Sequence, residues 1–145
     1  MKDGLRLTAK LIVTRRIGAR VVDSTVFHNK VTDLGASLFA QLISGSGTAP
    51  THMGIGTGYT AAAAGDTALE AQSARVALAA TTYGTKLVQW TATFPAGTAT
   101  GTMREFGLFN ASSGGTMTNR AVPTTPMVKT AAMSIDVVWQ MTLSN

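Results

Sequence analysis

The end of this 145-residue sequence shows a regular alternation that few folds can accommodate. Along residues 134–143, polar side chains such as Asp136 and Gln140 alternate with five apolar ones, Ile135, Val137, Trp139, Met141 and Leu143. Successive side chains of a β-strand point to opposite faces, so a period of two predicts a strand with one buried face. Trp139 is therefore expected in the core.

The start of the chain carries the same pattern. Apolar residues occupy every second position from Leu5 to Val13 and alternate with Arg6, Thr8 and Lys10. Residues 15–20 then predict a hairpin turn, and residues 21–27 a returning strand. Residues 1–30 are therefore expected to form a basic strand hairpin or arm, ahead of a β-rich body over residues 31–145.

One segment changes to a helical period. Between residues 33 and 43 the apolar side chains fall on one helical face, with Thr32 or Asp33 as N-cap and Gly45 as the C-terminal stop. A single helical turn is also conceivable at residues 66–70, where Thr67 and Glu70 have capping-box spacing.

The remaining sequence predicts short strands at 75–82, 86–94, 100–110 and 117–122, separated by Gly-, Pro- and Ser-containing turns. Such a succession is typical of a mainly β fold, an antiparallel β-sandwich or barrel-like domain, here with one short α-helix. The length suits one domain.

Positive charge is concentrated at the front of the chain. Residues 1–30 contain seven basic and two acidic side chains, whereas residues 31–145 contain five of each, so the net charge of +5 lies entirely in the first segment. This asymmetry predicts an acidic partner for that segment. The candidate contact residues are Lys2, Arg6, Lys10, Arg15, Arg16 and Arg20.

Nucleic acid and membranes are the less favoured partners. Readers of single strands stack bases on aromatic side chains, and Phe27 is the sole aromatic residue among the first thirty. The sequence has no apolar run of the roughly 18 to 20 residues that a membrane span requires and no signal-peptide core at its start, which predicts synthesis in the cytoplasm. Two interpretations of the basic segment remain: it binds an acidic protein surface, or its charges are simply solvated on an exposed strand.

No arrangement of reactive side chains indicates an enzyme. The chain has no cysteine, and its two histidines, His28 and His52, stand far apart without a nucleophile motif. Residues 54–58 are glycine-rich but match neither dinucleotide nor phosphate-loop spacing. Glu70 and Glu105 are the only glutamates, and Glu105 lies in an apolar strand where a buried ion pair is the better interpretation. We therefore expect no catalytic residues, metal or cofactor.

Several short stretches occur in a characteristic order at residues 28–35 (HNKVTDLG), 53–58 (MGIGTG), 66–70 (DTALE) with Arg75 behind, 105–110 (EFGLFN) and 114–117 (GGTM). As an ordered set they resemble small virion proteins of tailed bacteriophages, the head decoration or cement proteins and the related amino-terminal domains of tail-collar fibres. Together they span most of the chain from residue 28 onward. The resemblance implies a β-rich, non-enzymatic building block on a capsid exterior or within a tail.

The resemblance also implies partners and one internal contact. The partner would be the major capsid protein of the same phage. The protein would form a homo-oligomer, and the resemblance implies a trimer. A tail, baseplate or collar-fibre component is the alternative, although the end of the sequence just after a strand favours a separate capsid protein. The acid and arginine typical of the family match Glu105 and Arg75, which are thus expected to form a structural ion pair.

Overall fold

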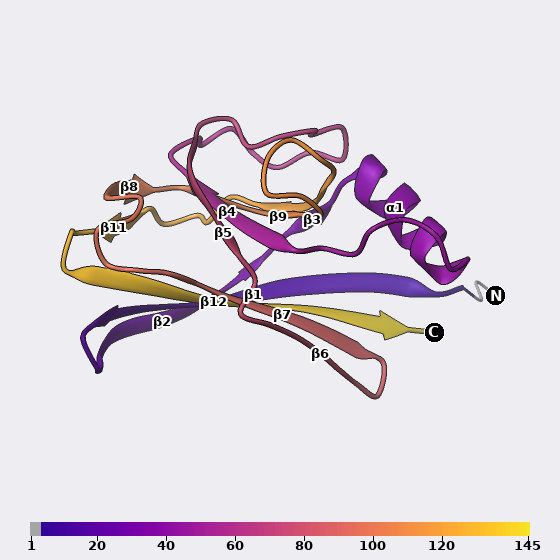
Figure 1. Cartoon of the computed structure of the whole chain (residues 1–145), viewed down its shortest axis with the longest axis horizontal. Helices are drawn as coiled ribbons and strands as arrows, with labels where there is room; N and C mark the ends of the chain where they lie inside the picture. The colour runs from indigo at the N-terminus through magenta and orange to yellow at the C-terminus, as the bar shows by residue number, and fades with distance from the viewer. Residues whose placement is uncertain (1–3) are drawn as a thin grey trace.

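The computed structural model describes residues 4–145 as two antiparallel β-sheets packed face to face (Figure 1). The first sheet has the strand order β2 (Arg20–His28), β1 (Arg6–Ile17), β12 (Met133–Ser144), β7 (Leu87–Phe94) and β6 (Ala80–Gly84). The second has the order β3 (Lys30–Val31), β10 (Met117–Ala121), β9 (Glu105–Phe109), β4 (His52–Gly56) and β5 (Gln72–Ala77). A small third sheet pairs β11 (Met127–Lys129) with β8 (Gly101–Met103). The predicted β-sandwich is confirmed.

The core lies between the two large sheets. Alternate residues of the first sheet, among them Leu11 and Val13 of β1, meet the apolar residues of β4 and β9. Trp139 is fully buried as expected, and its indole nitrogen donates to Asn29 Oδ1 at 2.5 Å. The other face of the first sheet is left uncovered by the second sheet and by the helix (Figure 1). We call this uncovered face, made by the outward residues of β2, β1, β12, β7 and β6, the open face.

The single predicted helix is α1 (Asp33–Ile43), which lies at the end of the sandwich where β1 begins and β12 ends (Figure 1). Its N-cap is Thr32, whose hydroxyl accepts from the Gly35 amide at 2.9 Å and donates to the Met117 carbonyl at 2.6 Å. The cap therefore fixes the helix start against β10. Gly45 follows the helix with a positive φ of 84°, a conformation suited to glycine.

The loop over residues 57–71 crosses the outer side of the second sheet. Leu69 from this loop packs with Phe109 and Met117 in a small apolar cluster separate from the main core. No helical turn forms at residues 66–70, so the capping-box expectation for Thr67 and Glu70 is wrong. Within residues 4–145, no helix has the length and apolar character needed to cross a membrane.

Candidate functional site

The basic hairpin predicted from the sequence is formed by β1 and β2, which pair antiparallel around the turn at Gly18. Of the six candidate contact residues, Lys2 lies outside the described residues. Arg6, Lys10 and Arg20 are exposed, and no ion pair among residues 4–145 involves them. These three cations are therefore available to a partner.

Arg15 is used within the hairpin and beyond it. Its Nε donates to Asp23 Oδ1 at 2.9 Å, its Nη2 pairs with Asp23 Oδ2, and its Nη1 donates to the Val128 carbonyl at 2.8 Å. The hydrogen bond from Arg15 holds the pKa of Asp23 below its ordinary value. Arg15 thus joins the hairpin to β11, and its charge is already balanced.

Arg16 is balanced in the same way by the neighbouring strand. Its Nε donates to Asp136 Oδ2 at 2.6 Å, and the Thr93 hydroxyl donates to the other carboxylate oxygen at 2.8 Å. These groups lie on the open face, where they join β1, β12 and β7. The positive charge that the hairpin presents to a partner is therefore smaller than the residue count suggests and belongs to Arg6, Lys10 and Arg20, with the exposed Lys30 of β3 beside it.

The hairpin is part of the sandwich rather than a loosened arm. β1 lies between β2 and β12 in the first sheet, with twelve residues in register against β12. Its Leu11 and Val13 have no exposed surface. Of the two forms expected, a hairpin or an arm, residues 4–30 therefore have the hairpin, whose Leu11 and Val13 belong to the core.

The ion pair expected between Arg75 and Glu105 is also wrong. The Arg75 guanidinium lies 3.5 Å from the centroid of the Phe109 ring and donates to Gln72 Oε1 and to the carbonyls of Ala111 and Gly114. Burial lowers its pKa. Arg75 therefore ties β5 to the turn after β9, on the side of the second sheet away from the main core.

Glu105 pairs instead with Arg120, an arginine that the sequence interpretation passed over. Arg120 donates from Nε and Nη2 to Glu105 Oε2 at 3.1 and 3.0 Å, and both side chains are buried. The carboxylate also accepts from three backbone amides, those of Gly58, Glu70 and Ala71. Both carboxylate oxygens of Glu105 thus accept hydrogen bonds, and the three amides hold the loop over residues 57–71 against β9.

Two further acids surround Arg120 at the surface end of the cluster. Arg120 Nη1 donates to Asp66 Oδ2 at 3.0 Å, and Glu70 Oε2 lies 3.7 Å from Nη2. The Thr60 amide donates to Glu70 at 2.8 Å, and this backbone hydrogen bond lowers the pKa of Glu70. The acids of this cluster all organise the loop.

The histidines lie on different sheets. His28 ends β2 and is exposed, whereas His52 begins β4 and shares a 2.8 Å hydrogen bond with the Thr51 hydroxyl. Within the described part of the chain, no group of three or more His, Asp or Glu side chains is arranged to hold a metal ion.

A pocket that no sequence motif indicated lies beside the loop over residues 57–71. It has a volume of about 390 Å³, and Tyr59, Arg104 and the segment at 122–126 contribute to its walls. Its residues come from three separate stretches of chain, so only the folded structure brings them together.

Comparison with protein-family models, with curated proteins and with solved structures finds no match to this chain. Its function is therefore inferred from its residues and their geometry.

Proposed function

We propose that this chain is a non-enzymatic structural protein of a tailed-phage virion, which decorates the head by binding the major capsid protein and so stabilises the shell. The observation that carries the proposal is the gathering of unpaired cations on one rigid hairpin. Arg6, Lys10 and Arg20 all lie on β1 and β2, while Asp23 of β2 and Asp136 of the adjoining β12 are already paired with Arg15 and Arg16. Such a surface complements an acidic protein face.

The open face beside this hairpin is suited to broad contact. A row of small or apolar side chains crosses all five strands in register, and it consists of Val26, Ile12, Val138, Thr91 and Ala80. Val26 is 53% exposed, and Ile12 and Val138 are half-buried. A neighbouring row contains Lys10, Gln140 and Gln89. Polar rows around an apolar row are the usual composition of a protein contact surface.

The placement of the reactive side chains supports a structural role. Glu105 is saturated by Arg120 and three amides, and Asp23, Asp66 and Asp136 are each engaged by arginine. The two histidines lie on different sheets. A general acid or base needs a free lone pair or proton beside a substrate cavity. The carboxylates named here already use their lone pairs within the protein, which supports a structural role over a catalytic one.

Stabilisation of a shell would follow from mass action. A protein that binds only the assembled lattice lowers the free energy of that lattice by RT ln(1 + [L]/Kd) at each site. Oligomerisation would add avidity, because two subunits joined to each other rebind at high effective concentration. β2 and β6 are the free edges of the first sheet, and edges of this kind are where a homo-oligomer of β-domains gains backbone hydrogen bonds.

Localisation in the particle is the direct test. Virions of the virus whose genome carries this sequence are separated into heads and tails, and the protein is located by immunoblot and by cryo-electron microscopy. Density of this sandwich on the head exterior is expected. Density in the tail, baseplate or collar would contradict the decoration proposal and favour the alternative, and absence from the particle would contradict both.

A charge-reversal variant tests the contact. Lys10→Glu/Arg20→Glu is compared with wild type for rebinding to heads stripped of the protein, and Lys86→Glu on the turn before β7 serves as the control for altered net charge. We expect the double variant to bind at least about tenfold more weakly and to lose the salt dependence of wild type. Equal binding of double variant and control would show that the hairpin is not the contact.

A further inference from the structure

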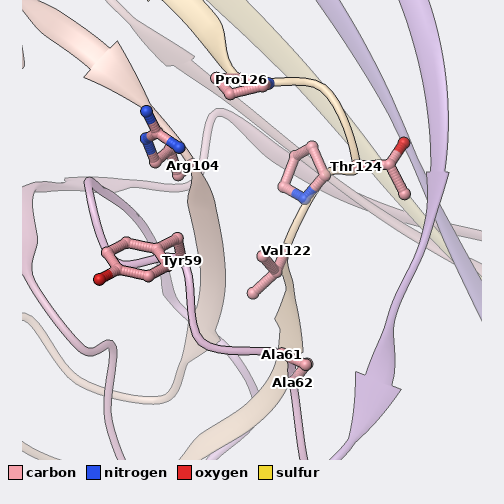
Figure 2. A pocket seen from close by; sticks show the side chains of 8 residues that line it. Tyr59, Ala61, Ala62, Arg104, Val122, Thr124 and Pro126 are labelled. Carbon is pink, nitrogen blue, oxygen red and sulfur yellow. The ribbon is translucent and has the colours of Figure 1, made fainter.

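The pocket beside Tyr59 has the size of a small-ligand site and a lining of mixed polar and apolar character. Its volume of about 390 Å³ lies at the lower end of the range for such sites. Figure 2 shows Tyr59 and Val122 on opposite sides of the opening, with Arg104 at one end and Ala61 and Ala62 at the other. The opening is thus a slot between an aromatic and an aliphatic wall.

Arg104 differs from the other arginines that are at least partly buried. Arg15, Arg16, Arg75 and Arg120 all donate from their guanidinium groups to protein oxygens. Among the hydrogen bonds and ion pairs of residues 4–145, none involves the guanidinium of Arg104, which lies 5.9 Å from the centroid of the Tyr59 ring. Its donors therefore face the pocket without a partner.

The base of the Arg104 side chain is nevertheless held in place. The Arg104 amide donates to the Gly56 carbonyl at 2.8 Å, which fixes the short connection between β8 and β9. The aromatic ring limits where the guanidinium moves, because a cation is attracted to a ring face. The positive charge is thus kept at the pocket.

Tyr59 is an exposed ring on a fixed backbone. The ring is 72% exposed, yet the residues on both sides of it are anchored, since the Gly58 amide donates to Glu105 at 3.1 Å and the Thr60 amide to Glu70 at 2.8 Å. An aromatic side chain held in this way offers a flat surface at a small entropic cost on binding. The buried Glu105 cluster therefore also positions the pocket wall.

The opposite wall is stiff as well. Val122 and the buried Pro123 follow β10, and Pro126 precedes β11. Proline fixes φ, so this segment has few alternative conformations. Two rigid walls facing each other select a flat or ring-shaped ligand rather than a flexible chain.

We propose that this pocket binds one anionic sugar ring, such as a hexuronic acid unit of an acidic polysaccharide. The ring would lie between Tyr59 and Val122 with its apolar C–H face on the tyrosine, and its carboxylate would accept hydrogen bonds from Arg104. A guanidinium matches a carboxylate in a bidentate geometry. An acidic side chain of a protein would reach Arg104 but would leave the Tyr59 ring uncovered, so a sugar ring fits the slot better.

Binding is tested by NMR titration of the full chain with a trimer of galacturonic acid, a neutral galactose trimer and a short Glu-rich peptide. We expect amide shifts at residues 59–62, 104 and 122–126 with the acidic trimer, and much weaker ones with the neutral trimer. Shifts confined to β1 and β2 would mean unspecific attraction to the basic hairpin and would overturn the proposal. The absence of any shift, or tighter binding of the peptide in this pocket, would also overturn it.

Variants separate the two recognition elements. Arg104→Gln should weaken binding of the acidic trimer by about tenfold, the value of a charge-assisted hydrogen bond, and should leave the neutral trimer unaffected. Tyr59→Ala should weaken binding of both trimers. Tyr83→Ala on β6, a ring 91% exposed outside the pocket, is the matched control and should bind as wild type does. Unchanged affinity in Arg104→Gln and Tyr59→Ala would refute the site, and unchanged thermal unfolding would show that both variants are folded.

Discussion

Arg120 and Glu105 form a buried ion pair in which two guanidinium nitrogens share one carboxylate oxygen, at 3.1 and 3.0 Å. Neither side chain is more than 2% exposed. The second carboxylate oxygen accepts from the amides of Gly58 and Ala71 at 3.1 and 2.7 Å. Charges removed from water persist when they are paired and hydrogen-bonded, and here the carboxylate accepts five hydrogen bonds and the guanidinium donates three. One glutamate thus joins β9, β10 and the loop over residues 57–71.

Glu105→Gln should be among the most destabilising conservative substitutions in the chain. Removal of the buried carboxylate leaves only the more exposed Asp66 and Glu70 to balance the charge of Arg120, and breaking a buried pair costs about 3 to 5 kcal/mol of unfolding free energy. Urea denaturation measures the loss. Asp23→Asn is the control, because the Asp23 side chain is 40% exposed and its pair with Arg15 is worth only about 0.2 to 1 kcal/mol. Equal effects of the two substitutions would contradict this account.

An apolar replacement of the whole pair should not restore stability. In a simple buried pair, Glu105→Leu combined with Arg120→Met is often neutral. Here the carboxylate also accepts from three amides, and each amide left unsatisfied costs about 1 to 3 kcal/mol. The double variant should therefore remain several kcal/mol less stable than wild type in the same urea experiment. Wild-type stability in this variant would mean that the amides find other partners.

Gly35→Ala should destabilise the protein although it favours the helix. In a helix interior, alanine is better than glycine by about 1 kcal/mol. A Cβ at position 35 would, however, overlap the Thr118 carbonyl on β10, where α1 packs closely against the strand. We expect the free energy of unfolding to fall by about 1 to 3 kcal/mol. Ser37→Ala on the exposed side of α1 is the control and should be neutral or slightly stabilising.

The sequence predicted those elements whose residues alternate or repeat over a long stretch. β12 and α1 were located closely, because one face of each is buried along most of its length. The turn predicted at residues 15–20 is shorter than expected, because Arg15, Arg16 and Ile17 continue β1 and Arg20 begins β2. The segment at 75–82 was predicted as one strand, yet the chain leaves the second sheet after Ala77 and enters the first sheet at Ala80. Alternation does not reveal this change of sheet, because β5 is only partly buried and β6 is exposed along its whole length, so neither strand carries a clear buried face in the sequence.

The local motif at residues 66–70 failed for a different reason. The spacing of Thr67 and Glu70 suits a helix start, but the Glu70 amide donates to Glu105, which lies far away in the sequence. Glu105 is also the acid whose partner was predicted wrongly, since it pairs with Arg120 and not with Arg75. Arg75 and Arg120 are equivalent candidates in the sequence, and only the sheet register, with Arg120 opposite Gly107, places Arg120 beside Glu105. The Tyr59 pocket depends on such distant contacts too.

Deletion of residues 1–17 should unfold the protein rather than merely release it from a partner. The deletion removes β1, which lies between β2 and β12 and contributes Leu11 and Val13 to the core. We expect loss of the cooperative thermal transition, measured by circular dichroism and calorimetry. Lys10→Glu/Arg20→Glu changes the same hairpin without touching the core and should melt within a few degrees of wild type. A cooperative transition in the truncated chain would contradict the central role of β1.

Lys129 should make the stability of the protein depend on pH in the alkaline range. Its side chain is fully buried, and its ammonium group donates to the carbonyls of Pro95 and Met133 at 2.9 and 2.8 Å, with no carboxylate in an ion pair with it among residues 4–145. Burial disfavours the charged form and lowers the pKa of Lys129 below its ordinary value of 10.5. Between the lowered pKa and 10.5, the unfolded chain binds more protons than the folded one.

Because the unfolded state holds the extra proton in that window, the contribution of Lys129 to stability rises as pH rises through it. We expect the difference in Tm between wild type and Lys129→Met to shift in favour of wild type as the pH rises toward 10.5, by roughly 2 to 4 °C for each kcal/mol gained. Lys86→Met is the control, because Lys86 is exposed and its removal should leave the slope of wild type unchanged. A Tm difference that stays constant or moves against wild type over this range would show that Lys129 keeps its ordinary protonation in the folded protein.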